Sequence, residues 1–133
     1  MEDTQTTNTT ILKKVLLVED DDNLAQVYLV RLKGEGFDVL RVPNGEDALV
    51  EALRYRPDLI LLDAMMPKVS GFDVLDILRN TPETSAMKIV MLTALSQESD
   101  RERAISMGVD EYLVKSQVVI ADVVSKIKAH LED

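Results

Sequence analysis

The chain has 133 residues, no cysteine and a formal net charge of −9 at pH 7, from 24 acidic and 15 basic residues. This length fits one domain, and the lack of cysteine excludes disulfides, thiolate metal sites and cysteine nucleophiles. The acidic balance argues against direct binding to nucleic acid or to an anionic membrane surface, because both need clustered lysine and arginine.

The first ten residues, Met1 to Thr10, are polar and acidic, and we expect them to form a disordered tail before a domain over residues 11–133. They lack the basic start and apolar core of a secretory signal. No apolar run in the chain approaches the ~20 residues that span a bilayer. With the missing cysteines, these observations favour a cytoplasmic protein without a membrane partner.

The first predicted strand, Val15–Val18, is followed by four acidic residues at 19–22. Helical spacing of apolar residues then predicts a helix over 23–33, ended by two glycines, and Asp22 is a candidate N-cap. The predicted apolar face of this helix consists of Leu24, Val27, Tyr28 and Leu32.

The next two strands are predicted over 37–42 and over Leu59–Leu62. The second is an unbroken apolar run, which is typical of a central parallel strand covered on both faces, and it ends at Asp63. The helices that follow them are predicted to end near Tyr55 and to span 72–79. The apolar face of the former consists of Ala48, Leu49, Ala52 and Leu53.

The fourth predicted strand, over 89–92, is closed by Thr93. The helix after it, at about 99–107, has the weakest apolar pattern, and we expect it to be mobile. A short strand over 112–114 ends at Lys115, and the last helix spans about 118–131. Its apolar stripe consists of Ile120, Val124, Ile127 and Leu131.

Strands and helices therefore alternate five times, which predicts an α/β fold: a doubly wound parallel sheet with right-handed crossovers and helices on both faces. Such sheets bind ligands at the carboxyl ends of their strands. If one sheet holds all five strands, the residues at the strand ends meet at one edge. These residues are Glu19, Asp20, Asp63, Thr93 and Lys115.

Three carboxylates at one edge raise one another's pKa unless a cation neutralises them. A few carboxylate oxygens suit Mg²⁺, which also keeps water and phosphate oxygens as ligands. Lys115 adds a positive charge and Thr93 a hydroxyl, and both can bind a phosphate oxygen. Since a carboxylate can itself be the nucleophile of phosphoryl transfer, the pattern predicts a site for a divalent cation and a phosphate.

Between Lys13 and Leu131, the strand-end motifs resemble those of the receiver domain of two-component response regulators. The resemblance implies a flavodoxin-like strand order 2-1-3-4-5 and a stand-alone receiver similar to the chemotaxis type. The motifs are Val18-Glu19-Asp20-Asp21, the stretch from Pro57 to Pro67, Met91-Leu92-Thr93-Ala94 and Tyr112-Leu113-Val114-Lys115.

The resemblance also implies the residues that take part in phosphorylation. Asp63 would accept a phosphoryl group from a phosphohistidine on a sensor histidine kinase and become 4-aspartylphosphate. Asp20, Asp63 and the backbone carbonyl of Met65 would bind Mg²⁺, and Glu19 would act mainly through water. Lys115 would contact the phosphoryl group.

The implied switch uses two further residues. Thr93 would move toward the phosphoryl group, and Tyr112 would turn inward behind it, which repacks the fourth helix, fifth strand and fifth helix. We expect this face to contact a downstream target or a histidine phosphotransfer protein, and to mediate any phosphorylation-dependent dimer of the monomer. Because a receiver and its tail use all 133 residues, we expect no direct contact with nucleic acid.

Three positions modify these expectations. The family usually has a cis proline after its lysine, where this chain has Ser116, so that bond is either trans with a shifted loop or a strained cis bond. Met65 and Leu95 are apolar at positions that in the family orient or exclude the hydrolytic water. The chain would then catalyse its own phosphorylation and a slow dephosphorylation, without turnover of a separate substrate.

Two alternative functions remain open. The spacing of Asp20 and Asp22 also fits the aspartate pair of a haloacid dehalogenase-like phosphatase. Leu24 stands where that family has a hydroxyl or β-branched residue, and no later acidic pair suits its second metal-binding motif. The other alternative is a pseudo-receiver that acts only as a binding module.

Overall fold

A computed structural model describes residues 11–132, so the predicted tail over residues 1–10 lies outside the described residues. Five parallel strands form one sheet in the order β3-β2-β4-β5-β6. Because β2 is the first of these strands along the chain, this is the predicted order 2-1-3-4-5, which is confirmed. The strands are β2 Lys14–Val18, β3 Asp38–Val42, β4 Leu59–Leu62, β5 Lys88–Thr93 and β6 Glu111–Val114.

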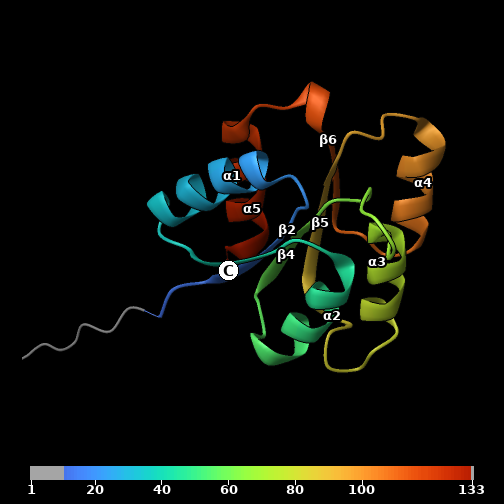
Figure 1. The fold of residues 1–133 in the computed structure, drawn as a ribbon, viewed down its shortest axis with the longest axis horizontal. Coiled ribbons are helices and arrows are strands. Elements are labelled where there is room, and N and C mark those ends of the chain that lie inside the picture. The colour runs from blue at the N-terminus through green and yellow to red at the C-terminus, as the bar shows by residue number, and fades with distance from the viewer. Residues whose placement is uncertain (1–10, 133) are drawn as a thin grey trace, which may run out of the picture.

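Helices cover both faces of the sheet, with α1 and α5 on one side and α2, α3 and α4 on the other (Figure 1). This arrangement confirms the doubly wound α/β fold. Among residues 11–132, no helix is long and apolar enough to cross a membrane. The helices are α1 Asp22–Gly34, α2 Gly45–Arg54, α3 Gly71–Arg79, α4 Glu98–Ser106 and α5 Ile120–Leu131, and a 3-10 helix, η1, spans Lys115–Gln117.

The apolar core has two layers, one on each face of the sheet. Every residue of β4 is buried, as the unbroken apolar run predicted for a central strand. Leu32 of α1 and Ile127 of α5 are fully buried on one face, and Leu75 of α3 is fully buried on the other. Because the five strands are parallel, their carboxyl ends lie along one edge of this two-layered core.

Two residues predicted on apolar helix faces are exposed. Val27 is 55% exposed, because the buried face of α1 follows Ala25, Tyr28 and Leu32 instead. Leu53 is 49% exposed, whereas Ala52 beside it is fully buried. The burial of Ala52 was predicted and is confirmed, whereas the buried Ala25 of α1 was not among the predicted residues.

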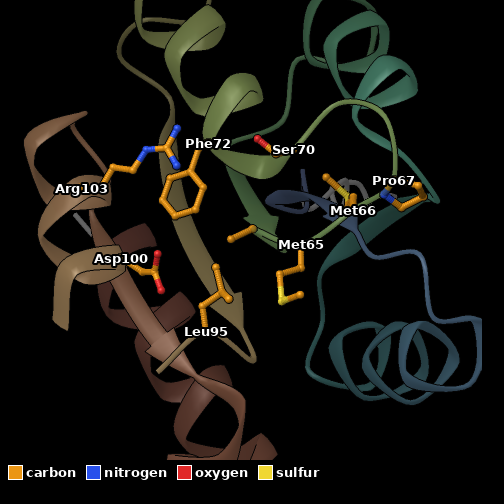
Figure 2. Close-up of a pocket in the computed structure, with 9 residues that line it drawn as sticks. Met65, Met66, Pro67, Ser70, Phe72, Leu95, Asp100 and Arg103 are labelled. Carbon is orange, nitrogen blue, oxygen red and sulfur yellow. The ribbon is translucent and has the colours of Figure 1, made fainter. Parts of the chain in front are cut away.

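The attachment of α4 to the rest of the fold depends on few apolar contacts. Of the nine residues of α4, Ala104 alone is buried. Two arginines add polar contacts: Arg101 donates to the carbonyl of Tyr112 (3.2 Å), and the guanidinium of Arg103 stacks on the ring of Phe72 at 4.2 Å (Figure 2). The predicted mobility of this helix stays a prediction.

Candidate functional site

The acidic residues after β2 have different partners. Asp21 is the N-cap of α1, since its carboxylate accepts the N–H of Leu24 at 3.0 Å. The predicted cap, Asp22, is wrong by one residue because the helix begins at Asp22 itself. Asp22 Oδ1 lies 2.9 Å from Arg41 Nη2. Glu19 is buried and accepts the N–H of Asp21 at 3.2 Å, whereas Asp20 is exposed.

Asp63 is buried where β4 ends. Its N–H donates to the carbonyl of Val18 (3.1 Å), so β2 fixes its backbone. Its Oδ1 accepts the N–H of Met65 at 3.0 Å, a turn in which the side chain caps its own loop. The start of α3 packs directly on this loop, and a Cβ on Gly71 would overlap the carbonyl oxygen of Asp63. Only glycine allows this approach.

The structure brings the predicted strand-end residues together. Carboxylate oxygens of Glu19, Asp20 and Asp63 all lie within 4.8 Å of one another. Lys115 Nζ lies 3.0 Å from Glu19 Oε1 and 3.1 Å from Asp63 Oδ2. These three carboxylates and one ammonium leave two negative charges uncompensated, which a divalent cation would balance.

Burial and charge shift the pKa of two of these groups. Burial raises the pKa of Glu19, the charge of Asp63 adds to this rise, and hydrogen bonds from Lys115 and Asp21 only partly oppose it. Burial would lower the pKa of Lys115, but its hydrogen bonds and attraction to Glu19 and Asp63 together raise it. The ammonium is therefore charged at neutral pH, and the negative charge of the cluster is only partly neutralised.

Thr93 and Tyr112 are both buried and meet at one residue, Leu95. The N–H of Leu95 donates to Thr93 Oγ1 at 3.3 Å, and the hydroxyl of Tyr112 donates to the Leu95 carbonyl at 3.0 Å. Tyr112 therefore already occupies an inward position in this structure. The two residues predicted to form the switch are linked through one peptide segment.

Ser116, which stands where the family usually has proline, does not displace Lys115 from the site. Throughout residues 11–132 the peptide bonds are trans, which decides between the two forms left open for the bond between Lys115 and Ser116. The chain continues after β6 as the 3-10 helix η1. Lys115 still reaches both Glu19 and Asp63.

A cleft of about 490 Å³ lies between the loop that follows Asp63 and helix α4 (Figure 2). Met65, 53% exposed, and Leu95 line it, as do Phe72, Asp100 and Arg103. The two residues predicted to affect the hydrolytic water are therefore apolar walls of an open cleft. Whether the carbonyl of Met65 binds a cation stays a prediction.

Sequence reasoning missed Arg41. Its Nε and Nη2 donate to the backbone carbonyl of Glu19 at 3.0 and 2.7 Å. One signal in the sequence could have identified it. Arg41 is a single basic residue one position before the end of the second strand, and it lies near the acidic residues 19–22 if the first two strands are neighbours.

Comparisons with known proteins bear on both fold and family. The family described as response regulator receiver domain matches residues 15–128. The phosphate regulon transcriptional regulatory protein PhoB of Rhizobium meliloti (strain 1021) is 37% identical over 121 residues, which are 91% of this chain and 53% of PhoB. The DNA-binding response regulator MtrA of Mycobacterium tuberculosis (strain ATCC 25618 / H37Rv) is 37% identical over 122 residues, 92% of this chain and 52% of MtrA.

The solved structure of chemotaxis protein CheY4 from Vibrio cholerae is similar throughout, with a TM-score of 0.84 and 26% identity. The match covers 91% of this chain and 100% of CheY4. By contrast, the chain spans about half the length of the two curated relatives, at 53% and 52%.

Proposed function

The chain belongs to the response regulator receiver family, and from that premise we propose that Asp63 is the residue that accepts the phosphoryl group. Members of this family are phospho-acceptor switches of two-component signalling, and membership implies a histidine kinase as partner. The observation that supports the assignment best is the meeting of Glu19, Asp20, Asp63 and Lys115 at one edge of the sheet.

The transfer needs no reactant beyond the phosphohistidine. A carboxylate oxygen of Asp63 attacks the phosphorus, a P–O bond forms, the P–N bond breaks, and the imidazole nitrogen leaves with the electron pair. The N–H of Met65 holds Oδ1 and so orients the carboxylate. Lys115, which now contacts Oδ2, would pass to an oxygen of the phosphoryl group, because charge-assisted hydrogen bonds to phosphate are strong.

The donor set fits Mg²⁺. The carboxylate oxygens are hard ligands within 4.8 Å of one another, and the exposed side of Asp20 leaves room for water and phosphate ligands. Asp20, Asp63 and the carbonyl of Met65 would hold the ion, with Glu19 acting through water. When bound, Mg²⁺ would neutralise charge on the phosphoryl oxygens.

The signal would leave the site through Thr93. If its hydroxyl turns to the phosphoryl group, the hydrogen bond from the N–H of Leu95 is lost, while Tyr112 still holds the Leu95 carbonyl. The Tyr112 carbonyl accepts from Arg101 of α4, so a shift of this segment reaches the helix. The face formed by α4, β6 and α5 would then contact the next protein: a target, a histidine phosphotransfer protein or a second phosphorylated copy.

The proposal includes no contact between this domain and nucleic acid. A net charge of −9 would repel a phosphate backbone. The names of PhoB and MtrA describe proteins about twice as long, so they do not assign DNA binding to the described residues. A cytoplasmic location, where the chain would meet its kinase, is part of the same proposal.

The phosphatase alternative receives no support from the position of Asp22. This residue is the first of α1 and accepts a hydrogen bond from Arg41. It is not part of the acidic cluster of Glu19, Asp20 and Asp63. A phosphatase would turn over small phosphoesters and lose that activity in Asp22→Asn. The receiver assignment predicts that neither the wild type nor Asp22→Asn turns over a small phosphoester.

The direct test is incubation with Mg²⁺ and acetyl phosphate, followed by measurement of the intact mass. We expect a gain of one phosphoryl group in the wild type and none in Asp63→Asn. Asp58→Asn is the matched control, because Asp58 is an exposed aspartate at the opposite end of the same strand, and it should be phosphorylated normally. If the wild type gains no mass, the pseudo-receiver is the better description.

A further inference from the structure

We propose that Arg41 is a positioning residue for the metal site: it holds the loop between β2 and α1 so that Glu19 and Asp20 face Asp63. This inference rests on the proposed function, since it concerns how the chain would bind Mg²⁺. Arg41 lies in β3, one of the two edge strands of the sheet, opposite Leu17 of β2. From there its side chain reaches past the end of β2 to the acidic loop.

Arg41 contacts the acidic loop at two places, the backbone carbonyl of Glu19 and the carboxylate of Asp22. Two guanidinium nitrogens, Nε and Nη2, converge on the backbone carbonyl of Glu19, at 3.0 and 2.7 Å. Nη2 also donates to Asp22 Oδ1 at 2.9 Å. The Arg41 side chain is 23% exposed, but that of Asp22 is 87% exposed. The contact with the carbonyl is therefore the one that water weakens least.

The carbonyl of Glu19 belongs to the peptide plane that leads into Asp20. Fixing this oxygen fixes the plane as far as the Cα of Asp20, and so restrains the position from which the Asp20 side chain extends. The N–H of Glu19 is held as well, by the carbonyl of Val42 at 3.2 Å. Strand β3 therefore binds both the backbone N–H and the backbone carbonyl of Glu19, the first of the proposed metal-site residues along the chain.

Arg41 also separates the four acidic residues into groups. It binds Asp22, and Asp21 caps the helix, so Glu19 and Asp20 are the two that join Asp63 in the cluster. Its positive charge offsets repulsion within the acidic loop. Residues that orient metal ligands from outside the coordination sphere commonly change metal affinity by about 10–100-fold when they are removed.

The test is a calorimetric titration of the metal-free protein with Mg²⁺. In Arg41→Met we expect binding weaker by about tenfold. Arg41→Lys should bind with intermediate affinity, because lysine keeps the charge but cannot donate from two directions to one carbonyl. Asp22→Asn should stay within about twofold of the wild type, since that pair is mostly exposed.

A second readout separates positioning from a general loss of stability. Raising the Mg²⁺ concentration should restore the phosphorylation rate of Arg41→Met with acetyl phosphate, because only the affinity is reduced. Arg31→Met is the matched control: it removes an arginine of α1 that pairs with Glu35, away from the acidic loop, and its Mg²⁺ affinity should not change.

Equal Mg²⁺ affinity in Arg41→Met and the wild type would overturn this inference and leave the proposed function standing. So would an Asp22→Asn variant that is weakened as much as Arg41→Met, because the exposed ion pair would then be the cause. A wild-type protein that neither binds Mg²⁺ nor gains a phosphoryl group would overturn the proposed function and this inference with it.

Discussion

At the scale of single residues, the site depends on one ammonium group shared by two buried carboxylates. Lys115 contacts Glu19 and Asp63, and the mutual attraction raises its pKa despite burial. A lysine suits this role because its ammonium is a compact charge on a flexible stem, which can move from the carboxylate to a phosphoryl oxygen. The residue thus offsets the negative charge of the cluster, and under the proposed function it would bind the phosphoryl group after transfer.

We expect the lifetime of the proposed acyl phosphate to depend on two side chains of the cleft, Met65 and Leu95. Met65 and Leu95 cannot orient or activate a water molecule, so the phosphoprotein should lose its phosphoryl group slowly. Met65→Asn introduces a polar group at the exposed wall, and we expect roughly tenfold faster loss, less than the ~10²–10⁴ of a true general base. Time-resolved intact mass in Mg²⁺ buffer measures this rate.

Val50→Asn, at an exposed apolar position of α2, is the control for adding an asparagine and should leave the rate unchanged. Loss of the wild-type phosphoryl group within seconds would contradict the role given to Met65 and Leu95.

Among the elements, the first residue of α3 packs against the loop that follows Asp63. Gly71 donates its N–H to the carbonyl of Ala64 at 3.0 Å, and a Cβ there would overlap the backbone of Asp63 and Ala64. Gly71→Ala must push α3 away from the loop or distort it. We expect a loss of about 1–3 kcal/mol in the free energy of unfolding, measured with urea, and slower phosphorylation by acetyl phosphate.

Gly34→Ala is the matched control, because a Cβ at this last residue of α1 meets nothing within 4 Å. It should leave phosphorylation unchanged and raise the free energy of unfolding by up to about 1 kcal/mol, since alanine is the better helix former. Equal effects of the two substitutions would contradict the close packing of α3 on the loop.

At the scale of the whole molecule, an ion pair joins the two helices on one face of the sheet. Glu35, which caps the end of α1, accepts from Lys128 of α5 at 2.6 Å and from Arg31 at 3.0 Å. These hydrogen bonds, that from Lys128 foremost, lower the pKa of Glu35. A carboxyl group whose pKa is lower in the folded chain adds stability above its unfolded pKa, and this stability is lost as the pH falls through its folded pKa.

Glu35→Gln should therefore lower the melting temperature at pH 7, and the difference from the wild type should shrink as the pH falls below about 4. Lys128→Met should remove much of the same stability, and the double variant should be little worse than either single one. Melting curves at several pH values measure this. A difference that persists unchanged at low pH would contradict the ionic origin of the contact.

The order of strands and helices, and the residues at the strand ends, were predictable from the sequence. The strand order followed from the family resemblance, and the meeting of Glu19, Asp20, Asp63 and Lys115 followed from the rule that parallel strands end at one edge. What depends on side-chain reach was not predictable. The two contacts of Arg41 with the Glu19 carbonyl need a particular rotamer, which the sequence pattern does not encode, although the predicted strand order already placed β3 beside β2.

Helix faces were predicted less well than strand ends, for a related reason. The buried face of α1 holds the small Ala25 beside Tyr28 and Leu32, whereas a predicted apolar stripe gave weight to the larger Val27, which is exposed. The bond before Ser116 was left open because one residue cannot tell which isomer its loop requires.

The measurement that tests the central claim most directly is the location of the phosphoryl group in the chain. After phosphorylation with acetyl phosphate and Mg²⁺, borohydride reduction converts an acyl phosphate into an alcohol, and peptide mass spectrometry then finds the reduced aspartate. The assignment predicts reduction at Asp63 and at no other aspartate or glutamate. Reduction at Asp20 or Asp22 with Asp63 intact would contradict it.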